Sequence, residues 1–128
     1  MEILETSEQI RLITSSITRA DLQIIAEERF GDMVKAVVDI SKNVMVIGAE
    51  MHVDEEEMLL EQGSEQTNLW GINLYPALFG DQFVEFDSMV NIRPRQNNRS
   101  RSVESSEVRE QIIGVVKKLV SDYDAVTT

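Results

Sequence analysis

Two runs of residues rich in β-branched side chains, 34–40 and 44–53, are separated by only three residues, 41–43. A connection this short cannot hold a crossover helix, so it predicts an antiparallel hairpin. The runs 69–75 and 82–93 have the same strand character, and 10–13 is expected to add a short edge strand. The sequence therefore predicts an antiparallel sheet of four or five strands.

Three helices are predicted around this sheet. A capping box that opens with Thr18 predicts a helix over 19–30, and apolar residues at helical spacing follow it. Asp54 is expected to cap a short helix over 54–62, and a similar apolar stripe predicts a final helix over 105–119. The order α-β-β-α-β-β-α predicts an α+β fold with the helices packed on one face of the sheet.

The length of 128 residues and the hydrophobic fraction of 42% fit one domain, with an ordered core over about 10–121 and flexible segments at 1–9 and 122–128. The chain has no cysteine, which excludes disulfides, thiolate metal sites and cysteine nucleophiles. The first residues lack the pattern of a secretory signal, and no stretch reaches the roughly 20 apolar residues that cross a membrane. We therefore expect a cytoplasmic protein that does not contact a membrane.

The charge of the chain is strongly acidic and unevenly spread. The net charge is −11, yet residues 93–101 contain four arginines and no acid. An acidic chain repels polyanions, and no aromatic residue is interleaved in the arginine stretch, so nucleic acid is a poor candidate partner.

The arginine stretch is the first candidate site. Guanidinium groups match phosphate and carboxylate geometry, and the stretch leads into a helix whose first N–H groups also favour anions. The alternative is that these arginines pair with the protein's own acids, notably those at 54–57. With three asparagines as orienting partners, the candidate ligand-binding residues are Arg93, Arg95, Asn98, Arg99, Arg101, Asn73 and Asn91.

The polar face of the predicted sheet is the second candidate site. Alternate side chains of a strand share a face, which groups Glu50 and His52 with polar residues of the later strands. This face is either a solvated sheet surface or a binding platform that adjoins the arginine stretch. The candidate catalytic residues on or next to it are His52, Glu50, Asp54, Glu85 and Asp87.

The spacing of Glu50, His52 and Asp54 permits two kinds of chemistry. On a strand the three would align, and they could hold a divalent ion or let His52 act as an acid or base beside a carboxylate. One histidine is few for zinc, and an exposed histidine among salt bridges fits the same pattern, so no metal site is predicted. The sequence contains no phosphate loop, dinucleotide fingerprint or serine-hydrolase motif, and it identifies no cofactor.

Several segments resemble a small prokaryotic family, domain-of-unknown-function family 5674. They are FGDMVKAVVD at 30–39, LWGINLYP at 69–76, EFDSMVNIRP at 85–94 and NRSR at 98–101, with residues 50–56 similar as well. The resemblance covers about residues 18–120, and residues 1–17 are atypical. It implies one compact prokaryotic domain and brings no activity with it.

Three classes of function follow from these features. The leading hypothesis is a binding module for a small anionic ligand, held by the arginine stretch. The second is a hydrolase-like enzyme that uses His52 with nearby carboxylates, with or without a divalent metal. The third is a protein-interaction or structural subunit, for which an uncovered sheet edge would provide the contact. The sequence does not decide whether the protein is an enzyme, and it gives no oligomeric state.

Overall fold

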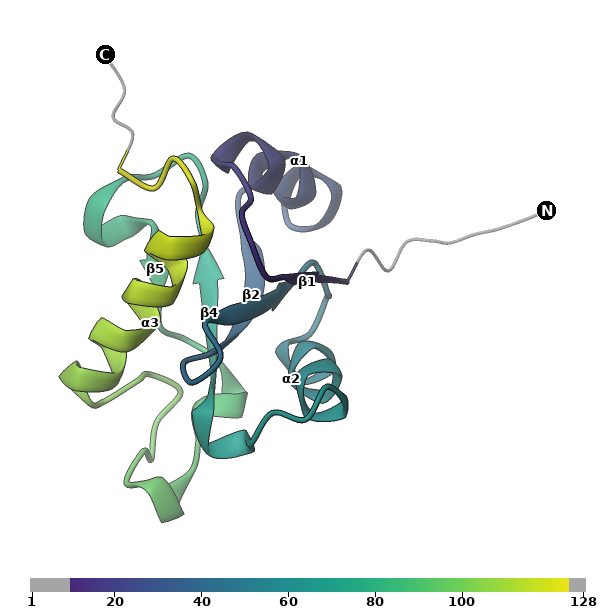
Figure 1. Cartoon of the computed structure of the whole chain (residues 1–128). Helices are drawn as coiled ribbons and strands as arrows, with labels where there is room; N and C mark the ends of the chain where they lie inside the picture. The colour runs from purple at the N-terminus through teal and green to yellow at the C-terminus, as the bar shows by residue number, and fades with distance from the viewer. Residues whose placement is uncertain (1–9, 125–128) are drawn as a thin grey trace.

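The computed structural model describes residues 10–124 as one antiparallel sheet with three α-helices (Figure 1). The sheet order is β1-β3-β2-β4-β5, and the strands are β1 (Arg11–Ile13), β2 (Val34–Asp39), β3 (Val44–Ile47), β4 (Leu69–Leu74) and β5 (Val84–Glu85). The helices are α1 (Arg19–Arg29), α2 (His52–Glu61) and α3 (Ser106–Leu119). The predicted α+β class, element order and short edge strand are confirmed. The flexibility expected for 1–9 and 125–128 lies outside the described residues.

Local signals in the sequence account for the first half of the fold. Thr18 and Asp21 form the predicted capping box at the start of α1, and Gly31 follows the helix with a φ of 96°. β2 and β3 pair as the predicted hairpin, and Asn43 turns the chain between them at a φ of 58°. The Asp39 carboxylate supports this turn by accepting hydrogen bonds from the backbone N–H groups of residues 41 and 42.

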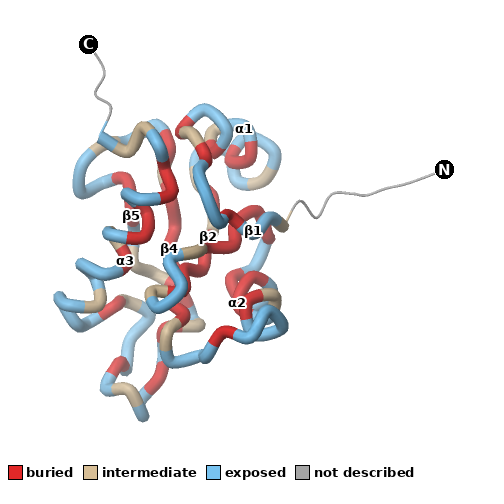
Figure 2. The backbone as a smooth tube through the Cα atoms, in the orientation of Figure 1, coloured by how far each residue is buried: buried red, intermediate tan, exposed pale blue. Residues whose placement is uncertain are grey.

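The helices cover both faces of the sheet, which corrects the prediction of one covered face. Residues of α1 and α3 pack with Ala36, Met45 and Ile72 in the main core. Leu59 of α2 packs on the opposite side, where Val37 faces it. The cause is that β2 and β3 have apolar residues at successive positions, so each strand presents an apolar surface on both faces. Figure 2 shows this as a sheet that is buried along most of its length.

β3 ends at Ile47, well before the predicted strand end at residue 53. Gly48 has a φ of 97°, which turns the chain out of the sheet, and α2 then begins at His52 with Met51 as its N-cap. The prediction that Asp54 caps this helix is therefore wrong, because Asp54 lies within its first turn. The strand alignment of Glu50, His52 and Asp54 does not exist either.

The predicted long strand over 82–93 is also wrong, because β5 contains only two residues. Beyond β5, the Asn91 side chain makes the hydrogen bonds to β4 that a neighbouring strand would otherwise make. Its Oδ1 accepts from Gly71 N at 2.8 Å and its Nδ2 donates to Gly71 O at 2.9 Å. The turn that carries Asn91 can lie this close only because residue 71 is a glycine. A Cβ at Gly71 would lie 2.6 Å from the side chain of Ser88 in the same turn. A side-chain amide thus continues the pairing of β4 where the backbone leaves the sheet.

Arg19 joins the start of α1 to the segments that follow β4 and α3. Its guanidinium carbon lies 4.5 Å and 4.1 Å from the ring centroids of Phe79 and Phe83. Its Nη1 donates to the carbonyl oxygens of residues 76 and 78, and its Nη2 donates to that of Tyr123 at 2.7 Å. The packed part of the chain therefore extends to Tyr123, past the residue 121 expected from the sequence.

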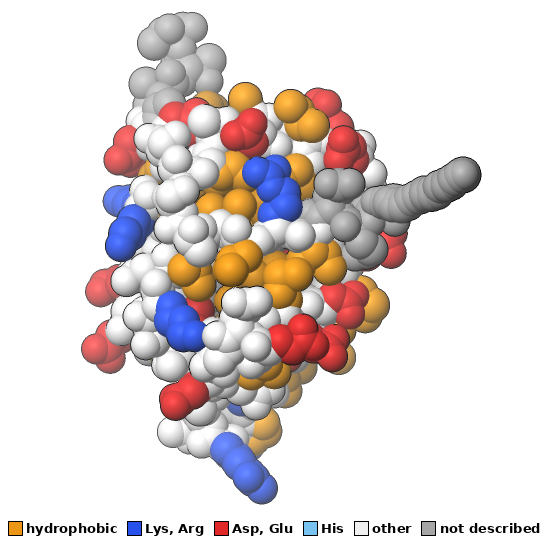
Figure 3. Space-filling view, turned by 45° about the vertical axis from the view of Figure 1, so that its right-hand side comes forward, with side chains coloured by type: hydrophobic (Ala, Val, Ile, Leu, Met, Phe, Trp, Pro, Cys, Tyr) orange, Lys and Arg blue, Asp and Glu red, His pale blue; other side chains and the backbone are white. Residues whose placement is uncertain are grey.

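The face drawn in Figure 3 carries a mixture of acidic, basic and apolar side chains. On this face, acidic side chains are spread around the rim, single basic groups lie between them and apolar side chains form a band across the middle. No continuous basic patch is present on that face. Within residues 10–124, no helix combines the length and apolarity needed to span a membrane.

Candidate functional site

His52 is fixed at the start of α2 with its ring against β4. Its Nε2 lies 2.8 Å from the main-chain carbonyl oxygen of Ile72, and the residue is 9% exposed. A carbonyl oxygen can only accept a hydrogen bond, so Nε2 carries the ring proton. In the neutral imidazole, Nδ1 is then the nitrogen with a free lone pair.

The surroundings of His52 keep this ring neutral. Burial lowers the pKa of His52 below its usual value of 6.5, and the positive charge of Lys35 lowers it further. The hydrogen bond to Ile72, the side chain of Asn73 and the charge of Asp87 oppose this decrease without reversing it. At pH 7 the imidazole is therefore unprotonated on Nδ1.

Asn73 lies beside the imidazole and has one unsatisfied atom. Its Nδ2 donates to Glu85 Oε1 at 2.9 Å and to the main-chain oxygen of Asp87 at 3.2 Å. These two acceptors fix the orientation of the amide, because the reversed amide would bring oxygen against oxygen. Asn73 is 5% exposed, and its Oδ1 has no hydrogen-bond partner among the described residues. A buried acceptor without a donor is uncommon and calls for an explanation.

Glu85 and Asp87, two of the predicted catalytic residues, lie close to His52 and Asn73. Glu85 Oε1 also accepts from the Tyr75 hydroxyl at 2.9 Å. Burial, followed by this contact with Glu85, raises the pKa of Tyr75 to about 12, so the phenol stays protonated. Asp87 is held by Arg101, whose Nε and Nη2 lie 2.7 Å and 3.3 Å from its two carboxylate oxygens. The structure thus brings together residues from both sets of sequence candidates.

These groups line one open cavity of about 540 Å³, which we call the His52 cavity. Its polar lining consists of the residues just described together with Lys35 and Ser88. The apolar side chains that line it are Met33, Met51, Val53, Met89 and Val90.

The charges that line the His52 cavity balance. Lys35 and Arg101 contribute two positive charges, Glu85 and Asp87 contribute two negative charges, and His52 is neutral. Among residues 10–124 no group of three histidine, aspartate or glutamate side chains is placed to hold a metal ion. The arrangement offers a neutral base and hydrogen-bond acceptors in a site without excess charge.

Residues 11–119 match the family described as protein of unknown function (DUF5674). The chain belongs to this family. No curated protein and no solved structure gives a significant match to the chain. The match agrees with the resemblance seen in the sequence, and it begins seven residues earlier, at the first residue of β1.

The arginine stretch is largely built into the fold of this DUF5674 chain. Arg93 is 9% exposed, lies over the Trp70 ring at 4.8 Å and donates to the carbonyl oxygens of Gln66 and Leu69. It also pairs with Glu56 at 3.4 Å, one of the acids named as an internal partner from the sequence. Arg93 is therefore a structural residue that has no free donor face for a ligand.

The two asparagines next to Arg93 are engaged as well. Asn91 pairs with Gly71 as described above. Asn98 is 3% exposed, and its Nδ2 donates to three main-chain oxygens, those of residues 91, 100 and 102. Both amides hold the loop in place.

The loop does bind a carboxylate, and that carboxylate is its own Glu104. Glu104 Oε2 accepts from the backbone N–H groups of Arg99 and Ser100, at 2.9 Å and 3.0 Å, and from the Ser100 hydroxyl at 2.8 Å. These contacts, the Ser100 hydroxyl first, lower the pKa of Glu104. The anion-binding geometry expected of this segment is thus satisfied within the chain.

The remaining candidates lie apart from the His52 cavity. Glu50 is exposed, and its Oε2 is 3.5 Å from Arg29 Nη1. Asp54 is exposed on the first turn of α2. Arg95 and Arg99 are also exposed, on the loop before α3. Of the twelve candidate residues, the cavity contains His52, Asn73, Glu85, Asp87 and Arg101.

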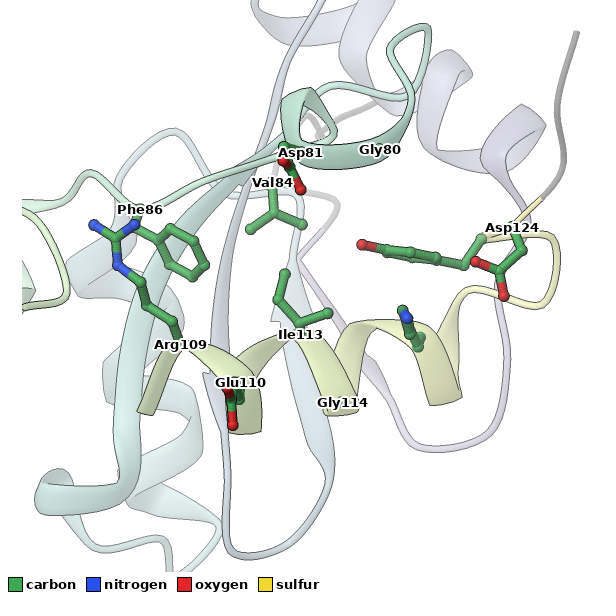
Figure 4. Close-up of a pocket in the computed structure, with 11 residues that line it drawn as sticks. Gly80, Asp81, Val84, Phe86, Arg109, Glu110, Ile113, Gly114 and Asp124 are labelled. Atoms are coloured by element: carbon green, nitrogen blue, oxygen red, sulfur yellow. The ribbon is translucent and has the colours of Figure 1, made fainter. Parts of the chain in front are cut away.

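A larger cavity of about 840 Å³ lies between α3 and β5. Val84 and Ile113 point toward one another across it, and the Arg109 guanidinium lies 4.5 Å from the centroid of the Phe86 ring (Figure 4). It contains no histidine, and none of the buried polar atoms without a partner in the described chain belongs to its lining residues. Although this cavity is larger, its lining residues include neither a candidate base nor an unpaired buried acceptor like those of the His52 cavity.

Sequence reasoning missed eight of the thirteen residues that line the His52 cavity, among them Lys35, Tyr75 and Met89. Lys35 and Tyr75 were placed on strands and were not singled out as site residues, and Met89 was placed within a strand that does not form there. The pairing of β2 with β4 sets Lys35 opposite Asn73. Correct strand pairing would have pointed to Lys35, whereas nothing local indicates the methionines.

Proposed function

We propose that this protein binds a small molecule in the His52 cavity and that His52 acts there as a general base through Nδ1. The observation that carries the proposal is the hydrogen bond from Nε2 to Ile72, because it fixes both the ring position and the tautomer. General bases work best when they are unprotonated at the working pH and held within reach of the proton that they remove. His52 meets the first condition by burial and the second by lining the cavity.

The neighbouring groups support acid–base chemistry. When Nδ1 takes a proton, from the ligand or from a water molecule beside it, the imidazole becomes positively charged. The charge of Asp87 favours that form, and Asn73 Oδ1 is next to the ring to accept the new N–H. A hydrolase-like reaction belongs to this class, since it begins with removal of a proton from water.

The hypothesis of an anionic ligand on the arginine stretch has weaker support. Arg93, Asn91 and Asn98 use their donors within the protein, and Glu104 occupies the backbone N–H groups of the loop. An anion in the His52 cavity would have to compete with Asp87 for Arg101. The geometry favours the neutral base over an anion site.

The proposal can be tested on the imidazole itself, because the chain has one histidine. Nitrogen-15 NMR across pH 4–8 should give an Nε2–H tautomer and a pKa below 6.5 for the native protein. Diethyl pyrocarbonate should modify His52 at pH 7, as mapped by mass spectrometry, because its ring is neutral and the residue lines an open cavity. An Nδ1–H tautomer, or a pKa at or above 6.5, would refute the assignment of His52 as the base.

A further inference from the structure

The chemistry of the His52 cavity also restricts the ligand that it takes. The first restriction comes from Asn73. Its amide orientation is fixed by two acceptors on the Nδ2 side, which leaves Oδ1 buried without a donor. While His52 is neutral, Asn73 Oδ1 is satisfied only by a hydrogen-bond donor that comes from outside the described chain. A ligand that offers only acceptors would leave it unpaired.

The second restriction comes from the ring beside it. His52 uses its one proton on Ile72, so Nδ1 is an acceptor in the neutral form. Asn73 Oδ1 and His52 Nδ1 therefore cannot satisfy each other. Two adjacent acceptors require donors, such as an amide NH₂ group or a hydroxyl group accompanied by a water molecule.

The third restriction concerns charge. Asp87 is held by Arg101, Glu85 receives hydrogen bonds from Asn73 and Tyr75, and the Lys35 ammonium lies 5.1 Å from the centroid of the Phe30 ring. The two positive and two negative side chains that line the cavity cancel. A charged ligand would lose hydration without meeting an unbalanced opposite charge.

The fourth restriction comes from the exposed apolar side chains that line the cavity. Met51 is 57% exposed, Met89 is 66% exposed and Val53 is 47% exposed, although all three are hydrophobic. Methionine side chains adapt their shape to an apolar partner, and they gain stability when one covers them. These three side chains are thus suited to contact the apolar body of a ligand whose polar end reaches Asn73.

We infer that the ligand of the His52 cavity is an uncharged molecule with a hydrogen-bond-donating end, an amide NH₂ or a hydroxyl, and an apolar body. The donor end pairs with Asn73 Oδ1 and His52 Nδ1, and the body covers Met51, Val53 and Met89. This inference rests on the proposed function, because it assumes that the cavity is the ligand site. It replaces the anionic ligand expected from the sequence with a neutral donor.

The test uses four matched probes: hexanamide, N,N-dimethylhexanamide, hexanoate and hexylammonium. Each is titrated into the full chain at pH 7, and the NMR signals of the His52 ring and the Asn73 side-chain amide give the dissociation constant. We expect hexanamide to bind at least about tenfold more tightly than its dimethyl counterpart, because only the primary amide satisfies the buried acceptor. Hexanoate and hexylammonium should bind more weakly than hexanamide.

Variants test the two ends of the ligand separately. The double substitution Met51→Ser and Met89→Ser should weaken hexanamide and leave acetamide unchanged, since acetamide lacks the apolar body. Ile24→Ser is the matched control, because Ile24 is 57% exposed on α1 and does not line this cavity. Asn73→Ala should remove the preference for hexanamide over the dimethyl amide. If Asn73→Ala does not fold, the comparison of the two amides on the wild type still decides the role of the acceptor.

The outcomes separate this inference from the proposed function. Stronger binding of hexanoate or hexylammonium, or equal binding of the two amides, overturns the neutral-donor inference. Shifts that are as large in the methionine double variant as in wild type overturn the apolar contact. No binding by any of the four probes also overturns the inference. In every one of these cases, the tautomer and pKa of His52 remain an independent measurement of the general-base proposal.

Discussion

His52 Nε2 donates to the main-chain oxygen of Ile72 at 2.8 Å, which links the first residue of α2 to the middle of β4. This bond joins two elements that lie on different parts of the sequence and determines how the imidazole is oriented in the cavity. Because the carbonyl cannot donate, the bond also determines which ring nitrogen is free. The chemistry proposed for the site follows from this one contact and from the burial around it.

The stability of the protein should depend on pH through His52. Its pKa is lowered in the folded state, so between the folded pKa and about 6.5 the unfolded chain binds more protons than the folded chain. The contribution of the neutral ring should be complete above this pH and should decrease as the pH falls through the folded pKa. Urea unfolding of wild type and His52→Gln at pH 5–7.5 measures it, and parallel pH profiles for the two proteins would contradict it.

Arg93 should be a stability residue. Substitution by alanine removes a buried guanidinium from Trp70, Glu56 and several carbonyl oxygens, and leaves those acceptors unpaired. Breaking a buried pair of this kind costs about 3–5 kcal/mol. Arg95→Ala, in the same loop but exposed, should change the free energy of unfolding by less than about 0.5 kcal/mol. Equal effects of the two substitutions in urea unfolding would show that Arg93 is not structural.

Two glycines should respond in opposite directions to alanine. At Gly71 a Cβ would lie 2.6 Å from Ser88 and 2.8 Å from Val90, so Gly71→Ala should destabilise the protein by about 1–3 kcal/mol. Gly114 lies within α3 with nothing within 4 Å of an added Cβ, so Gly114→Ala should stabilise it by about 1 kcal/mol. Thermal unfolding of both variants checks the prediction. A stable Gly71→Ala protein would mean that the turn over residues 88–91 does not pack on β4.

The two tyrosines, Tyr75 and Tyr123, should ionise at a higher pH than free tyrosine. Burial and the hydrogen bond to Glu85 raise the pKa of Tyr75 to about 12, and burial raises the pKa of Tyr123 as well. Ultraviolet titration of the native protein should therefore give little phenolate near pH 10. The variant Tyr123→Phe isolates Tyr75, and Glu85→Gln should lower its pKa by removing the adjacent negative charge. An ordinary pKa for Tyr75 in Tyr123→Phe would exclude the contact with Glu85.

Part of the candidate site could be predicted from the sequence. His52, Glu85, Asp87, Asn73 and Arg101 were selected because their residue types suit ligand or proton chemistry, and all five line one cavity. The reason given for His52 was wrong, because it assumed a strand alignment with Glu50 that the turn at Gly48 prevents. The apolar residues that line the cavity come from separate segments and have no common sequence signal.

The sequence by itself determined the elements whose signals are local. The capping box at Thr18, the turn after Asp39 and the apolar stripe of α3 depend on contacts between residues a few positions apart, which periodicity and propensity describe. Tertiary structure decided where strands end and which side chains meet. The Asn91 amide pairs with Gly71 twenty residues earlier, and the His52 ring reaches Ile72 twenty residues later. Such contacts depend on the packing of distant segments, and no local pattern encodes them.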